Sequence, residues 1–254
     1  LCIYDFEDDD VFSALYDLLC DDEEDTVALQ SYFFKELAKS ESLKRHISRL
    51  ILTNDNIFTK AACAGKVNQL SIAVINAVKS DLAKLEEIAS LTAQDILADI
   101  DDEDIKEILL TLPGWEVGKP LAPLDSHWDR QLDELIKYHR ENGYGIYAKN
   151  IAFTWRDEEI TPVNSIDPIR LTDLKNYELQ RNKVIDNTES FIAGHPANNV
   201  LLYGDRGTGK SSTVHAILNE YWQKGLRMIE IPKSAVADLS LIREQIADSP
   251  MKFI

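Results

Sequence analysis

An eight-residue run, Gly204 to Ser211, constrains the fold of this chain more than any other part of its sequence. It reads GDRGTGKS and fits the pattern G-x-x-x-x-G-K-S, in which backbone N–H groups converge on a phosphate. The pattern needs glycine because the loop takes backbone conformations that other residues avoid. It also needs a strand before it and a helix after it, whose N-terminal dipole favours an anion. We therefore expect an α/β arrangement around this run.

The sequence on both sides of the loop has the patterns that this arrangement needs. Asn199 to Tyr203 is a short apolar run that predicts the strand before the loop. Ser211 to Lys224 has apolar residues at helical spacing, and Gly225 then supplies a helix stop. Leu226 to Ile231 predicts a second strand. Together these segments predict a strand–loop–helix–strand unit.

The residue types of the loop predict how each would contact a nucleoside triphosphate and magnesium. Lys210 is expected to reach the β- and γ-phosphates and to stabilise the charge that develops during catalysis. The Ser211 hydroxyl is expected to ligate Mg²⁺, and the Ser212 hydroxyl to touch the α-phosphate. The predicted nucleotide-binding set is Gly204, Asp205, Arg206, Gly207, Thr208, Gly209, Lys210, Ser211 and Ser212.

Other enzymes carry the same loop, so a kinase or a GTPase is the alternative to an ATPase. A GTPase would show N-K-x-D downstream of the loop. The Asn182-Lys183 pair lies upstream instead, and no Asp follows it at the required spacing. A titration that compares ATP, GTP and their diphosphates separates these classes of enzyme.

Charge and composition disfavour several other classes of protein. The formal net charge of −17 disfavours general affinity for nucleic acid, because phosphate backbones need clustered Lys and Arg. Acidic runs near 5–10, 21–25 and 101–104 favour a solvated surface over a docking site for a basic partner. No segment has the length of a membrane span, and the N-terminus lacks a basic secretory signal. The expected location is the cytoplasm.

The cysteines and histidines show no metal-binding or disulfide pattern. Cys2, Cys20 and Cys63 are odd in number and far apart, which suits a reducing compartment. The histidines form neither HxxxH nor HExxH, so we expect them to be structural or on the surface. They are His46, His127, His139, His195 and His215.

The first half of the chain, residues 1–145, is predicted to be an all-α domain. Thr92 and Asp95 have the spacing of a capping box, and Pro and Gly residues between 112 and 123 predict an irregular segment. The apolar stripes of the helices are interpreted as core packing. Amphipathic spacing predicts these helices at 11–20, 26–39, 43–52, 67–89, around 96–97, from about 101 to 112 and at about 125–141.

The second half, residues 146–254, is predicted to be the N-terminal part of an α/β domain. Ile151 to Trp155 predicts a strand, and about 178–192 predicts a helix that ends at Gly194. Met251 to Ile254 reads as the opening of a further apolar strand. That ending, with a first residue that is not Met, predicts that the chain is part of a longer protein.

A longer stretch around the loop resembles a bacterial family. It includes Leu171-Thr172-Asp173-Leu174, Gln180 and Arg181, Asn187-Thr188, Phe191-Ile192-Ala193-Gly194-His195 and Pro196-Ala197-Asn198-Asn199-Val200-Leu201-Leu202-Tyr203-Gly204. This stretch is similar to an uncharacterised family of predicted AAA+ ATPases, catalogued only as a domain of unknown function. The resemblance is close over about 165–250 and loose over the first half, where Asn54-Asp55-Asn56-Ile57-Phe58 fits a segment of the family.

The resemblance implies a P-loop NTPase fold of the AAA+ type, ATP hydrolysis and assembly into a ring. It places the linker that lies against the adenine base at Ile169 to Tyr177. It also implies that the Walker B strand, the sensor residues, the arginine finger and the helical lid follow Ile254. In AAA+ sheets the strand before the loop lies between two strands that come later in the sequence. The strand predicted at 199–203 is therefore expected to lack its neighbours in this chain.

These observations lead to two expectations that are compatible with each other. The chain is expected to contain an AAA+-like α/β domain with an incomplete parallel sheet, preceded by the all-α domain. This α/β domain is expected to bind ATP with Mg²⁺ but not to hydrolyse ATP by itself. Residues 1–145 are alternatively expected to be a helical protein-interaction module, for which the nucleotide site is only a switch.

Overall fold

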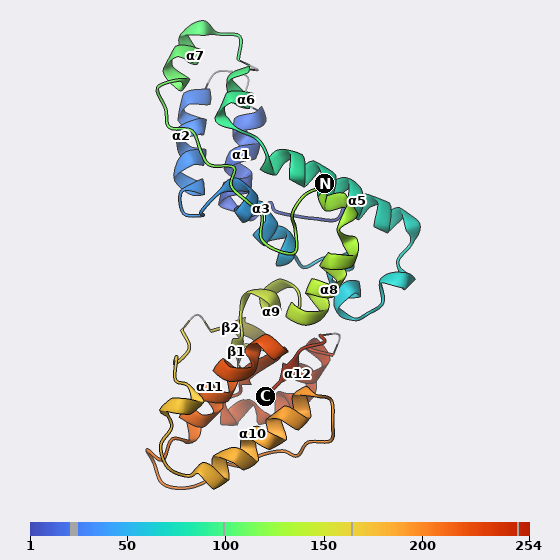
Figure 1. The fold of residues 1–254 in the computed structure, drawn as a ribbon, viewed down its shortest axis with the longest axis vertical. Coiled ribbons are helices and arrows are strands. Elements are labelled where there is room, and N and C mark those ends of the chain that lie inside the picture. Colours follow the sequence, from blue (N-terminus) through green and yellow to red (C-terminus); the bar gives the residue numbers. More distant parts are fainter. Residues whose placement is uncertain (21–24, 99, 164, 248) are drawn as a thin grey trace. The chain divides into compact units, whose positions relative to one another are not determined.

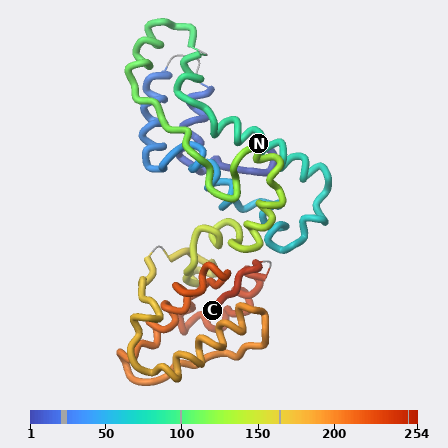
Figure 2. Tube along the Cα trace, in the orientation of Figure 1, coloured from blue at the N-terminus to red at the C-terminus, as the bar shows by residue number. Residues whose placement is uncertain are grey.

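The computed structural model describes residues 1–20, 25–98, 100–163, 165–247 and 249–254, and the chain divides into two compact units (Figure 1; Figure 2). The first unit is Leu1–Tyr138 and the second is His139–Ile254. Most of the acidic run at 21–25 lies outside the described residues. The domain boundary placed after residue 145 stays a prediction.

The described part of the first unit contains helices and no strand. Residues 112–123 are irregular, as predicted, whereas α4, capped by Asn56, was not predicted. No helix in the described ranges is long and apolar enough to cross a membrane. The helices are α1 (Asp10–Cys20), α2 (Thr26–Leu37), α3 (Leu43–Leu52), α4 (Ile57–Cys63), α5 (Ile72–Ala89), α6 (Ala93–Ala98), α7 (Glu103–Leu109) and α8 (Leu132–Asn142), whose last residues belong to the second unit.

Two of these helices begin later than the apolar spacing indicated. The helix predicted from about 125 begins at Leu132. Before it, the Glu86 carboxylate accepts hydrogen bonds from the amides of His127 and Trp128, both at 2.9 Å, and fixes a short 3-10 turn. Likewise α5 begins only after Ser71, whose hydroxyl caps it. Side-chain hydrogen bonds therefore determine both starts.

The apolar faces of the helices meet in one core. Phe33, Phe58 and Trp128 are fully buried there, and each such side chain stabilises the fold by about 1.5–3 kcal/mol. Asp81 on α5 is buried as well. Its carboxylate accepts hydrogen bonds from the three amides of Cys2 to Tyr4, at 2.7 to 3.2 Å. These bonds hold the first residues of the chain against α5.

The described residues of the second unit form a sheet with strand order β2-β1-β3-β4. Its strands are β1 (Ala152–Arg156), β2 (Glu159–Pro162), β3 (Leu226–Glu230) and β4 (Lys252–Phe253). The strands predicted at 151–155, 226–231 and 251–254 are thus confirmed. β1, β3 and β4 are parallel, whereas β2 pairs antiparallel with β1. Asp157 and Glu158 form the two-residue turn between β1 and β2, both with positive φ.

Helices cover both faces of this sheet. On one face lies α11 (Lys210–Tyr221), whose Leu218 clusters with Ala152 and Met228, and α10 (Glu178–Ile192) packs beside it. On the other face lie α9 (Gly145–Lys149) and α12 (Leu239–Gln245), whose Ile242 clusters with Phe153. The second unit is therefore an α/β fold with a mostly parallel sheet, which is compatible with a P-loop NTPase.

The strand predicted at Asn199 to Tyr203 does not form. This segment pairs with no strand among the described residues, and Leu201 and Tyr203 are 82% and 88% exposed. An extended segment becomes a strand only when another strand satisfies its N–H and C=O groups. Both edges of β3 are already paired, with β1 and with β4, so the segment finds no partner there.

Candidate functional site

The predicted phosphate-binding residues form a loop that ends in the first turn of α11. Gly209 is the N-cap residue with φ of 79°, and Gly204 and Gly207 have φ of 140° and 83°. Residues with a Cβ atom rarely adopt these conformations. A Cβ at Gly207 or Gly209 would meet no atom within 4 Å, so the backbone conformation, and not lack of space, requires glycine there.

Lys210 reaches back across this loop. Its Nζ donates hydrogen bonds to the carbonyl oxygens of Gly204 at 3.0 Å and Asp205 at 2.6 Å, and to Thr208 Oγ1 at 3.2 Å. Thr208 Oγ1 itself donates to the Asp205 carbonyl oxygen at 2.9 Å. No described carboxylate forms an ion pair with Lys210. An anion placed against the loop would therefore be the first negative charge to pair with this ammonium group.

The hydroxyl side chains of the first turn suit a magnesium ion that is held together with phosphate. Ser211 is exposed, and its hydroxyl makes no hydrogen bond to a described residue, while Ser212 is half-buried beside it. Within the described ranges, no three His, Cys, Asp or Glu side chains gather to hold a metal ion. Mg²⁺ commonly takes few protein ligands and completes its shell with phosphate and water oxygens. The residues present thus fit a magnesium–nucleotide complex.

Hydrogen bonds that the sequence does not reveal anchor α11. Asn219 Nδ2 donates to the carbonyl oxygens of Asp167 and Ile169, both at 2.8 Å, and the Tyr221 hydroxyl donates to the Glu189 carboxylate on α10 at 2.9 Å. Burial and the Glu189 carboxylate raise the pKa of Tyr221 to about 12, so it remains a donor. These bonds fix the start of the predicted adenine linker on α11, whereas contact of that linker with a base stays a prediction.

The chain that leads into the loop is attached to α10 and not to the sheet. Asn187 Oδ1 accepts a hydrogen bond from the Asn198 amide, and Asn187 Nδ2 donates to the Asn198 carbonyl oxygen, both at 2.8 Å. Gly194, with φ of 76°, follows the end of α10 and turns the chain back along it. One asparagine therefore positions the segment six residues before Gly204. No spacing rule in a single sequence predicts this pair, because it depends on how the turned chain returns.

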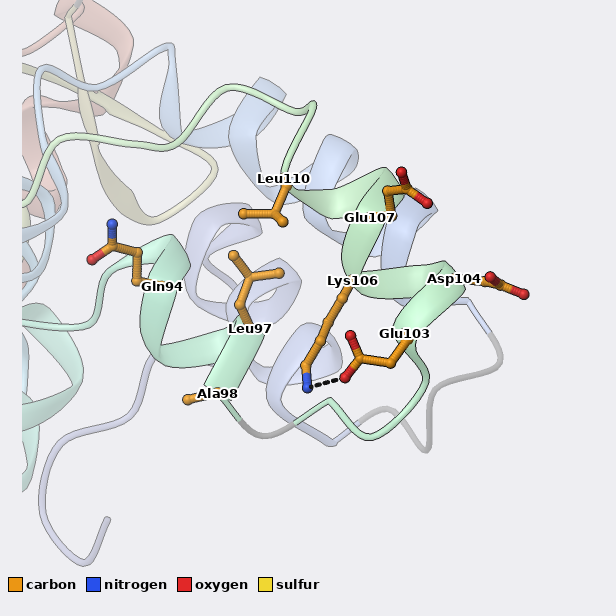
Figure 3. A pocket seen from close by; sticks show the side chains of 8 residues that line it. All are labelled: Gln94, Leu97, Ala98, Glu103, Asp104, Lys106, Glu107 and Leu110. Atoms are coloured by element: carbon orange, nitrogen blue, oxygen red, sulfur yellow. Dashed lines mark hydrogen bonds and ion pairs between the residues drawn. The ribbon is translucent and has the colours of Figure 1, made fainter.

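A hollow in the first unit is less suitable for a nucleotide. It lies between α6 and α7, where Leu97 and Leu110 point toward one another across the gap (Figure 3). Carboxylates repel a triphosphate, whereas the loop at 204–212 offers amides and an ammonium group. The charged residues that line the hollow are Glu103, Asp104, Lys106 and Glu107, and Lys106 pairs with Glu103 at 3.2 Å.

Comparison with known proteins places the loop within a family match. A family profile described as "Protein of unknown function (DUF815)" matches residues 148–254, so the expected similarity to a family of unknown function is present over this part of the chain. A segment of 68 residues is 37% identical to a replication factor C large subunit of Staphylothermus marinus. That segment covers 26% of this chain and 15% of that protein. No solved structure shows significant similarity.

Proposed function

We propose that the second unit binds ATP with Mg²⁺ through residues 204–212, as the nucleotide site of an AAA+ ATPase. The observation that carries the proposal is the loop, in which glycines of positive φ lead into a helix N-terminus and Lys210 lies over them. The family match and the local similarity to a replication factor C large subunit support it. ATP and ADP are the expected small-molecule partners.

Binding would replace contacts within the loop by contacts to phosphate. Lys210 Nζ would exchange neutral carbonyl acceptors for anionic oxygens, with which hydrogen bonds are roughly twice as strong. Amide N–H groups of the loop would donate to the phosphates, and the Ser211 hydroxyl would ligate magnesium. Hydrolysis also needs a carboxylate that orients water, and, on the resemblance to AAA+ ATPases, we propose that this carboxylate belongs to the strand that includes β4. Residues 1–254 are therefore expected to bind ATP without lysine-dependent turnover.

Ring assembly and a protein partner are proposed for the whole protein on the same resemblance. The helical first unit, which carries no part of the loop, is the segment that we propose engages the partner. A pull-down that compares the whole protein with a form lacking residues 1–145 tests this role. Retention of all partners by the shortened form would contradict it.

Isothermal titration of the 254-residue chain tests nucleotide binding. Lys210→Ala is expected to weaken binding of ATP by about tenfold to a hundredfold, because a charge-assisted hydrogen bond contributes about 1.5–3 kcal/mol. Lys233→Ala is the matched control, since Lys233 is an exposed lysine of the same unit outside the loop. Titration of GTP in parallel decides between an ATPase and a GTPase. Equal ATP affinity of Lys210→Ala and wild type would contradict the assigned site.

A further inference from the structure

Three polar side chains from separate segments meet at the turn between α2 and α3. Ser40 Oγ lies 2.8 Å from His46 Nδ1, and His46 Nε2 lies 2.8 Å from Asp9 Oδ1. His46 is 7% exposed, and the Phe12 amide donates to Asp9 at 2.9 Å. A hydroxyl, an imidazole and a carboxylate in this sequence of contacts have the geometry of a nucleophile, its base and an orienting group.

The carboxylate determines which ring nitrogen carries the proton. An ionised Asp9 can only accept, so Nε2 of His46 donates to it, and Nδ1 of the neutral ring keeps its lone pair for the Ser40 hydroxyl. Burial raises the pKa of Asp9, but hydrogen bonds from His46 and the Phe12 amide outweigh this and hold that pKa below its ordinary value. The ring nitrogens are exchanged relative to Ser-His-Asp proteases, while the three roles are the same.

Ser40 also lines a hollow of about 420 Å³ in the first unit. Phe34, Leu37 and Trp115 supply apolar lining. The Trp115 ring is fixed, because its Nε1 donates to the Leu91 carbonyl oxygen at 2.9 Å. A small apolar group can therefore lie beside the Ser40 hydroxyl.

Two backbone amides that follow Ser40 are available to a developing oxyanion. The N–H groups of Glu41 and Ser42 have no hydrogen-bond acceptor among the described residues, and both residues line the hollow. The amide of the residue after a nucleophile is a recurrent donor in oxyanion sites. Glu41 and Glu116 in the lining outnumber Lys39, which pairs with Glu36, so the charges of the hollow disfavour an anionic substrate.

From these contacts we propose that Ser40, His46 and Asp9 form an acyl-transfer site that hydrolyses small uncharged carboxylic esters. Ser40 Oγ gives its proton to His46 Nδ1 and bonds to the carbonyl carbon, which forms a tetrahedral oxyanion. His46 passes the proton to the departing alkoxide as its C–O bond breaks, and Ser40 is acylated. Water then gives a proton to His46 Nδ1 and attacks the acyl carbon. The acid leaves as Ser40 Oγ regains that proton.

Labelling of the whole chain with a fluorophosphonate, followed by mass spectrometry of the modified peptide, tests the nucleophile. Hydrolysis of p-nitrophenyl butyrate tests turnover. Ser40→Ala removes the nucleophile and His46→Gln removes the base. Ser31→Ala is the matched control, because Ser31 is an exposed serine of α2 in the same unit, and its hydroxyl donates to the Val27 carbonyl oxygen outside the hollow. Thermal unfolding of each variant by circular dichroism shows whether the fold is intact.

The label is expected on Ser40, and ester hydrolysis is expected to fall by about a hundredfold or more in Ser40→Ala and His46→Gln but not in Ser31→Ala. If His46→Gln does not fold, Ser40→Cys gives the same information. Its new thiol should react with iodoacetamide faster than the exposed Cys2 and Cys20, because His46 takes its proton. An unlabelled Ser40, undiminished hydrolysis in Ser40→Ala or His46→Gln, or a new thiol in Ser40→Cys that reacts no faster than Cys2 and Cys20 would each overturn the proposal.

Discussion

Gly209→Ala should weaken ATP binding by about five- to thirtyfold. Gly209 has φ of 79°, and a Cβ there would meet no atom within 4 Å, so overlap with neighbours contributes nothing to the cost. What remains is the free-energy cost of holding an L-residue in the left-handed conformation, which is about 1–2 kcal/mol. Because no neighbour holds the new methyl group in place, we expect the free loop to relax toward negative φ. Binding must then return residue 209 to positive φ so that the loop amides converge on phosphate, and this cost reduces the free energy of binding.

Gly194→Ala is the matched control for this prediction. Gly194 has φ of 76° and equally open surroundings, but it follows the end of α10 outside the loop. Its replacement should lower the free energy of unfolding by a similar amount and leave ATP affinity within about twofold of wild type. Isothermal titration gives the affinities, and urea unfolding gives the stabilities. Wild-type affinity of Gly209→Ala, or an equal loss of affinity in Gly194→Ala, would refute the reasoning.

Three further predictions concern groups that position other parts of the chain. Asn187→Ala should remove both bonds to Asn198, and hydrogen exchange of the Asn198 amide should become faster; unchanged exchange of that amide would show that Asn187 does not hold this segment. Asp81→Asn should destabilise the first unit by about 2–4 kcal/mol in urea unfolding, because one of the two acceptor oxygens becomes an NH2 donor facing the amides of Cys2 to Tyr4 and the charge that strengthens these bonds is lost. Burial lowers the pKa of His139, so below the ordinary value of 6.5 the unfolded chain takes up a proton that the folded chain does not. Stability should therefore fall as the pH drops below 6.5, and His139→Gln should flatten this dependence; an equal slope in the variant would contradict it.

The sequence predicted the elements whose pattern is local. Helical spacing located α10 and α11, and Gly225, with φ of 87°, ends the 3-10 turn that follows α11. The Thr92–Asp95 capping box is present, with the Thr92 amide 2.7 Å from the Asp95 carboxylate. Each of these features depends on residues within one or two helical turns of each other. For that reason a single sequence contains enough information to predict them.

Features that depend on distant residues were mispredicted or missed. The run at 199–203 has the composition of a strand, but a strand needs a neighbour, and composition says nothing of which edges are free. β2 escaped prediction because Asp157 and Glu158 form a positive-φ turn without the usual Asn or Gly. The loop residues themselves were predictable, because the spacing of their glycines and lysine is a recognisable local pattern. Their anchors Asn187 and Asn219 were not, because each pairs with backbone across the fold.

Backbone amide chemical shifts of the 254-residue chain, recorded before and after addition of ATP and Mg²⁺, test the central claim most directly. We expect the largest shift changes at 204–212, and we expect Lys210→Ala to reduce them strongly at the nucleotide concentration that half-saturates the wild-type chain. Shifts confined to the acidic hollow between α6 and α7, or no shifts at a saturating nucleotide concentration, would contradict it.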